Sequence, residues 1–132
     1  MRAGLLSLLL LLGCAVPPET AAPSLDSPDP ATRSAAVGRL IRAGQACNLA
    51  LSVTTLDRAA RIEAAALKQH ERGGGTAARD DHLRSLAAPD FGADRQRQDR
   101  WCAGQRPEVE RMNALLGGPA GAAILQPAEV GR

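Results

Sequence analysis

The apolar residues between Pro30 and Leu116 recur at the three- and four-residue spacing of amphipathic α-helices, and no segment alternates like a β-strand. A first helix is predicted from Pro30 to Cys47, because Asp29 can cap its N-terminus and proline suits a first turn. Its apolar stripe consists of Val37, Leu40, Ile41 and Gly44.

Two further helices are predicted on either side of the three glycines at 73–75. The sequence Thr54-Thr55-Leu56-Asp57 is similar to a capping box and predicts the start of a helix that the glycines end. This helix carries its apolar stripe at Leu56, Ala59, Ile62, Ala66 and Leu67. A shorter helix follows Thr76 and ends before Pro89, with Leu83, Leu86 and Ala87 on its stripe.

The last predicted helical segment runs from about Ala93 to Leu116. One face carries Trp101, Cys102, Gln105, Val109, Met112 and Leu116. Pro107 lies inside the segment, so the pattern fits either one kinked helix or two helices, with the second beginning at Pro107. We therefore predict an all-α domain of three to five helices over residues 30–117, followed by a disordered tail over 118–132.

The first 13 residues are rich in leucine and have the layout of a secretory signal peptide. Arg2 precedes the apolar run of Leu5 to Leu12, which is too short for the roughly 20 residues of a membrane-spanning helix. The run has no polar face, which argues against a helix of the folded domain. Five of the nine prolines then fall between residues 15 and 30, so residues 14–29 are predicted to form a disordered, semi-extended tether.

The leucine-rich run ends in Leu11-Leu12-Gly13-Cys14, which resembles the lipobox of bacterial lipoprotein precursors. The resemblance implies cleavage before Cys14, lipidation of its thiol and anchoring on the periplasmic side of the cell envelope. In the enterobacterial version of the family, Ala15 after the cysteine would favour the outer over the inner membrane. The alternative is cleavage nearby, for example after Ala15, which would give a soluble periplasmic or secreted protein.

The two remaining cysteines, Cys47 and Cys102, form an even pair on the apolar stripes of their helices. In an oxidising compartment they are predicted to form a disulfide, which would close a loop of about 56 residues and contribute roughly 4 kcal/mol. Such a bond suits a domain with few large apolar side chains. The alternative is two unpaired core thiols. Neither cysteine lies in a Cys-x-x-Cys motif, so a redox enzyme is not expected.

Composition and charge argue against nucleic acid as a partner. The net charge is +2, and aromatic residues make up 2% of the chain, namely Phe91 and Trp101. Nucleic-acid binding normally requires a basic surface, and single strands also need aromatic rings for base stacking. Trp101 is expected to pack near the disulfide rather than to bind a ligand.

His70 and His82 flank the three glycines, and a hairpin there could bring together His70, Glu71, Asp80, Asp81 and His82. Imidazole and carboxylate groups suit a zinc-like ion, but His-x-x-x-His spacing is lacking and a triglycine is a poor frame for ligands. The other interpretation is a set of solvated polar helix ends. We expect no metal or other cofactor, with His70, His82 and Asp81 as the candidate ligands if a metal binds.

The sequence offers little support for an enzyme. It lacks Gly-x-Ser-x-Gly, and residues 73–76 lack the lysine of a phosphate-binding loop. We expect a membrane-tethered module that binds a protein partner. Its layout is similar to that of pilotins, lipoproteins that deliver the type II secretin to the outer membrane, and the likeness extends to Cys47-Asn48 and Cys102. The alternative is a small-ligand or metal-binding protein of the envelope.

Overall fold

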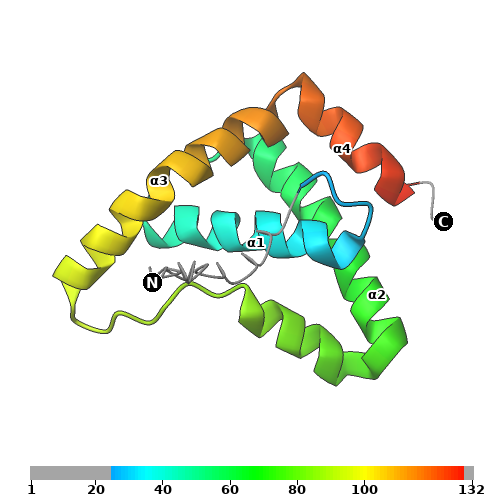
Figure 1. The fold of residues 1–132 in the computed structure, drawn as a ribbon, viewed down its shortest axis with the longest axis horizontal. Helices are drawn as coiled ribbons and strands as arrows, with labels where there is room; N and C mark the ends of the chain where they lie inside the picture. Colours follow the sequence, from blue (N-terminus) through cyan, green and yellow to red (C-terminus); the bar gives the residue numbers. More distant parts are fainter. Residues whose placement is uncertain (1–24, 130–132) are drawn as a thin grey trace, which may run out of the picture.

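The computed structural model describes residues 25–129, which form four helices and no strand (Figure 1). The helices are α1 (Pro30–Ala46), α2 (Val53–Ser85), α3 (Arg95–Gly117) and α4 (Pro119–Glu129). The predicted all-α fold with a disulfide is therefore confirmed. The predictions for the signal peptide, for Cys14 and for most of the tether lie outside the described residues.

Helix α1 lies in the middle of the fold, and α2 and α3 pack against it (Figure 1). Its N-terminus is capped as the sequence predicts, because the Asp29 carboxylate accepts a hydrogen bond of 2.9 Å from the Thr32 amide. The helix ends at Cys47, and Asn48 follows with a left-handed φ of 52°. Asparagine tolerates this conformation better than most residues, so the chain turns here towards α2.

Helix α2 begins earlier than predicted. Ser52, rather than Thr54, is the N-cap, and its hydroxyl accepts a hydrogen bond of 3.0 Å from the Thr55 amide. Thr55 is fully buried and Leu56 is 39% exposed, so the prediction that Leu56 begins the core stripe is wrong. The buried stripe passes through Thr55, Ala59 and Ile62 instead. The polar Thr55 can be buried because its hydroxyl donates a hydrogen bond to the Asn113 carbonyl.

The three glycines bend α2 into two arms, which are residues 53–73 and 76–85. Gly74 and Gly75 leave the helical conformation, and Gly75 has a φ of +68° and a ψ of −162°. A side chain would be strained at Gly75, so glycine suits this bend. The two helices predicted around the glycines are these arms, and the second arm turns back beneath α1 (Figure 1).

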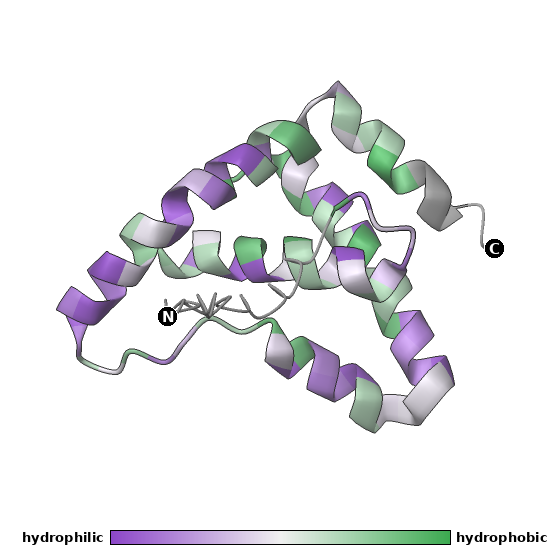
Figure 2. Ribbon diagram, in the orientation of Figure 1, coloured by the Kyte–Doolittle hydropathy of each residue, from purple (hydrophilic) through white to green (hydrophobic). Residues whose placement is uncertain are grey.

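Helix α3 is continuous through Pro107, which settles the choice that the sequence left open. Proline cannot donate to the carbonyl of residue 103, but Ala103 and Pro107 are both exposed, so water can hydrate that carbonyl. The buried residues of α3 are Val109, Met112 and Leu116, all in its C-terminal half. Its N-terminal half is largely hydrophilic (Figure 2).

The core is a small cluster drawn from α1, α2 and α3. Its buried members are Val37, Ile41, Ala59, Ile62, Met112 and Leu116. Partly buried Leu25 and Ile124 pack against this cluster from outside the predicted domain boundaries of 30–117. The domain therefore extends in both directions beyond the segment that helical periodicity outlines.

The prediction of a disordered tail from residue 118 is wrong for Pro119–Glu129, which form α4. The mostly apolar helix turns back along the first arm of α2 (Figures 1 and 2). Glycine permits the turn, because a Cβ atom at Gly121 would clash with the Leu116 carbonyl oxygen. Arg58 donates hydrogen bonds to the carbonyls of Leu116 and Gly118 at the end of α3, so the junction is held by specific contacts.

Candidate functional site

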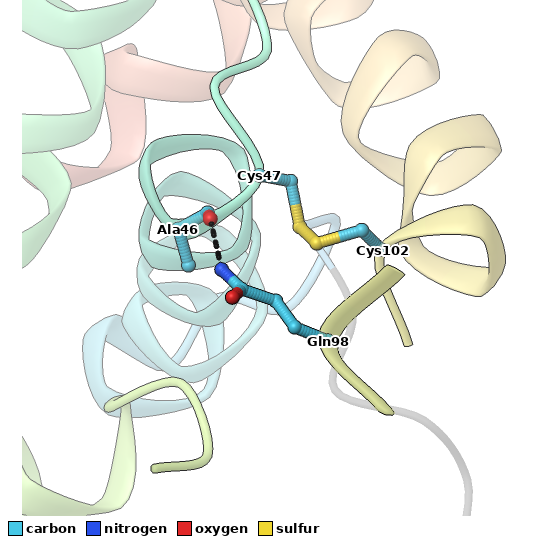
Figure 3. The surroundings of a disulfide bond; sticks show 4 residues. All are labelled: Ala46, Cys47, Gln98 and Cys102. Carbon is cyan, nitrogen blue, oxygen red and sulfur yellow. Dashed lines mark hydrogen bonds between the residues drawn. A yellow bond between two sulfur atoms is a disulfide. The ribbon is translucent and has the colours of Figure 1, made fainter. Parts of the chain in front are cut away.

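Cys47 and Cys102 form a disulfide between the end of α1 and the N-terminal half of α3, with Cα atoms 5.6 Å apart. Gln98 lies one turn before Cys102 and donates a hydrogen bond of 3.0 Å to the Ala46 carbonyl (Figure 3). The carbonyls at the end of α1 need partners from outside the helix, and Gln98 supplies one of them. The Cys47–Cys102 disulfide and the hydrogen bond from the Gln98 side chain together fix α3 to the end of α1.

An open cavity of about 400 Å³ lies beside this disulfide. Its charged lining residues are Arg95, Asp99 and Arg106, so its net charge is small.

Trp101, next to Cys102, is half-buried, and the centre of its ring lies 5.4 Å from that of Phe91. The Arg97 guanidinium lies over the Phe91 ring, 5.1 Å from its centre. This aromatic pair therefore stiffens the connection between α2 and α3.

The second candidate site is a pair of stacked imidazoles across the bend of α2. His70 comes from the first arm and His82 from the second, and their ring centres lie 4.4 Å apart with the planes inclined by 28°. The Nε2 atom of His82 lies 2.8 Å from the Ser34 hydroxyl oxygen on α1. The bend thus joins three helical segments at one small polar cluster.

His82 is buried, and His70 beside it is partly buried. His82 is 9% exposed. The Nε2 atom of His70 is also buried, and it has no hydrogen-bond partner among the described residues. Burial therefore favours the neutral form of His82.

Burial lowers the pKa of His82, and the nearby positive charges of His70, Arg42 and Arg39 lower it further. Glu63 acts in the opposite direction. Its carboxylate, however, lies 2.6 Å from the Arg42 guanidinium in an ion pair. The balance keeps His82 neutral at a pH where an exposed histidine would begin to be protonated.

The third candidate metal ligand, Asp81, does not join the two histidines. Its side chain is 72% exposed and pairs with Arg84 on the same arm. The lone pairs of imidazole nitrogens lie in the ring plane, so two stacked rings do not direct them at one ion. Within residues 25–129, no group of three or more His, Cys, Asp or Glu side chains is arranged to hold a metal.

Sequence reasoning missed two polar residues of α1, Ser34 in the histidine cluster and Arg33 next to it in the sequence. Both are buried, Arg33 at 2% exposure and Ser34 at 0%. Arg33 donates a hydrogen bond of 2.7 Å to the Ile124 carbonyl of α4. A signal was present, because Ser34 lies three and seven residues before Val37 and Ile41 on the same helical stripe. No spacing in the sequence could have shown that α4 covers Arg33.

The Asp29 cap also connects α1 to the first arm of α2. Its carboxylate accepts a hydrogen bond of 2.9 Å from the Gln69 amide, next to His70. Hydrogen bonds from Gln69 and from Thr32 lower the pKa of Asp29. Asp29, the capping residue that the sequence identifies, therefore also holds Gln69, the residue before His70, in place.

Among residues 25–129, no helix combines the length and apolar character that crossing a bilayer requires. Comparisons with family models, with curated proteins and with solved structures yield no match. The candidate sites therefore rest on their own geometry.

Proposed function

We propose that this chain is a lipoprotein tethered to a membrane of the bacterial cell envelope, whose helical domain binds a protein partner. The Leu11-Leu12-Gly13-Cys14 motif after a leucine-rich run supports the tether. Two acyl chains on Cys14 would hold the protein stably at the membrane, where one chain would not. The proline-rich segment after Cys14 would give the domain reach away from the surface.

The observation that carries the binding role is exposed apolar surface near the junction of α2 and α3. Val53 is 83% exposed and Leu56, one turn later on α2, is 39% exposed. On α3, Leu115 is 38% exposed. The Asn113 side chain, two residues before Leu115, accepts a hydrogen bond of 2.9 Å from the Ser52 amide. The three side chains therefore lie at the same end of the domain.

Exposed apolar side chains concentrated in one region are typical of surfaces that bind another protein. A domain with so few large apolar residues gains stability when it buries them, yet Val53 stays in solvent. We infer that a partner covers this end, in the manner of other small helical adaptors. The disulfide, in this proposal, keeps the domain folded in an oxidising periplasm.

The tether is tested by the intact mass of the mature protein purified from membranes. Diacylation of a Cys14 that has become the N-terminus is the expected result. An unmodified N-terminus at another residue, such as Val16 after cleavage at Ala15, would contradict the lipoprotein assignment and favour a soluble exported protein. A Cys14→Ser variant should move the protein from the membrane to the soluble fraction.

The binding role is tested by a photo-crosslinking residue placed at Val53 in intact cells. A single reproducible protein should be captured at Val53 and Leu115, and the same residue at Ala60, which is exposed on α2, should capture none. Equal capture at all three positions, or at none, would contradict a specific partner at this end. The soluble Cys14→Ser form separates the two parts of the proposal, since binding does not require the anchor.

A further inference from the structure

We propose that the His70–His82 stack is an acid-sensitive latch, which holds the second arm of α2 against α1 at neutral pH and releases it in mild acid. This inference goes beyond the proposed function and does not depend on the membrane anchor or on a partner. It concerns the arm of residues 76–85 and the helix turn that ends it at Leu86.

The second arm is attached to the fold at both of its buried side chains. His82 meets His70 and Ser34, as described above, and Leu86 is 1% exposed. Leu86 packs directly on Gly38 of α1, where a Cβ atom would lie 2.6 Å from the leucine Cδ1. Other side chains of the arm, such as Asp81 and Arg84, face solvent. Weakening the histidine contact therefore removes a large part of what holds the arm.

The bend supplies the hinge that such a movement requires. Gly73, Gly74 and Gly75 are all exposed. A Cβ atom at Gly73 or Gly75 would meet no atom within 4 Å, so neighbouring side chains do not clamp these positions. Glycine rotates more freely than any other residue, and a small change at Gly74 and Gly75 swings the whole arm. The contact between His70 and His82 therefore restrains a bend that neighbouring side chains restrain little.

Protonation of His82 opposes the closed state for two physical reasons. A charge on the His82 ring would be buried away from water. It would also be repelled by the nearby positive charges of His70, Arg42 and Arg39. The open arm relieves both costs, because it returns the His82 ring to water.

The charges that act on His82 compensate for a proton only in part, because Glu63 favours the protonated form and the others oppose it. Helix α1 presents Arg39 and Arg42, and the first arm presents Glu63, which is already paired with Arg42. On the second arm Asp80 pairs with Arg79 and Asp81 with Arg84. At the start of α1, Asp29 bonds to Gln69, the residue before His70. Each of these nearby carboxylates therefore already has a partner.

The direction of the pH effect follows from the lowered pKa of His82. When the arm opens, the pKa of His82 returns towards its ordinary value of 6.5. Below that pH the open state takes up a proton before the closed state does, so acid shifts the equilibrium towards opening. At neutral pH both states are unprotonated, and the closed state retains the stack and the Ser34 contact.

Hydrogen exchange of the disulfide-intact full chain, corrected for the intrinsic rate, tests the latch at about pH 7.5 and about pH 5. The amides of residues 78–86 should lose protection by at least about tenfold in acid, while those of residues 109–116 should keep theirs. Unchanged protection of the second arm would overturn the proposal. Equal loss in both segments would overturn it as well, because it would indicate global unfolding.

Two variants separate the latch from other acid effects. In His82→Gln the amide can still reach Ser34 but does not titrate, so the protection of the arm should no longer depend on pH. The matched control is Asp81→Asn, which removes an exposed titratable group from the same arm and should leave the pH response intact. A pH response that persists in His82→Gln, or disappears in Asp81→Asn, would contradict the mechanism.

A measurement on the unaltered protein keeps the test independent of how His82→Gln folds. The NMR titration of the His82 ring proton should give a midpoint below the ordinary value of 6.5. A midpoint at or above this value would overturn the latch. His70→Phe, which keeps a ring for stacking but removes the second charge, should reduce the loss of protection in acid without abolishing it.

Discussion

The two halves of α3 are held to the rest of the fold in different ways. The C-terminal half buries Val109, Met112 and Leu116 against α1 and α2. Within residues 95–106 of the N-terminal half, no residue is fully buried. That half is attached to α1 by the Cys47–Cys102 disulfide and by the hydrogen bond from Gln98. We call the C-terminal half, which buried side chains hold, the packed half. The N-terminal half, which the disulfide and one hydrogen bond hold, is the tied half.

The difference shows how a chain with few large apolar side chains can extend a helix beyond its hydrophobic core. Hydrophobic burial stabilises a helix only where its apolar side chains reach other apolar groups. Beyond that point a covalent bond substitutes for packing, because it limits the unfolded chain rather than adding contacts. The tied half can therefore carry a hydrophilic surface without detaching (Figure 2).

Replacing both cysteines by alanine should have the largest effect. The free energy of unfolding should fall by roughly 4 kcal/mol, because the unfolded chain regains the entropy of the closed loop. Urea unfolding measures this loss, and hydrogen exchange should show the tied half opening before the packed half. A loss below about 1 kcal/mol would mean that side-chain packing, rather than the bond, holds residues 95–106.

Leu116→Ala tests the packed half. Leu116 is fully buried, so the substitution should lower the free energy of unfolding by about 3 kcal/mol through lost burial and a remaining cavity. Its neighbour provides the control, since Leu115 is 38% exposed and Leu115→Ala should cost less than about 1 kcal/mol. Similar losses for the two variants, measured by urea unfolding, would refute this account of the packed half.

Thr55→Val tests the polar contact at the centre of the packed half. Valine has a similar shape but leaves the Asn113 carbonyl without the hydroxyl that lies 3.1 Å away. Thermal unfolding should reveal a loss of about 1–2 kcal/mol. Thr54→Val, at an exposed position on the same helix, should stay within about 0.5 kcal/mol of the wild type. A neutral Thr55→Val would show that burial alone determines this position.

Gln98→Ala should have the smallest effect, about 0.5–1 kcal/mol, because it removes one partly exposed hydrogen bond from the tied half. Gln96→Ala, on an exposed residue nearby, is the control and should be silent. The useful measurement repeats both variants in the cysteine-free background. There the loss for Gln98→Ala should change, since the amide and the disulfide hold the same two segments together.

Local patterns predicted much of the secondary structure because their causes are local. The Asp29 cap, the stripe of α1 and the bend at the glycines each depend on neighbouring residues alone. The start of α2 was misplaced by two residues because Ser52, Thr54 and Thr55 are all plausible caps. Only the contact with Asn113 shows why Thr55, a polar residue, faces the core.

The candidate sites were predicted less completely, because they join segments that are distant in the sequence. The two histidines were expected to approach each other, and they do, but Ser34 comes from a helix 48 residues away. The third expected ligand, Asp81, points outwards because the second arm uses its inner face for His82 and Leu86. Helix α4 escaped prediction because glycine and proline, which disfavour helices, stand at Gly117-Gly118-Pro119 before it and at Gly121 within it.

The sequence by itself determined the helical class, the position of the bend and the cysteines that can pair, since periodicity, glycine content and cysteine count are properties of the chain. It also carries the whole basis for the proposed lipid anchor. Only the tertiary structure decided which half of α3 is packed, that the chain after residue 118 covers Arg33, and that two imidazoles stack with His82 buried. The reason is that burial is a property of the assembled fold, so the pKa of His82 and the role of the disulfide emerge only when distant segments meet.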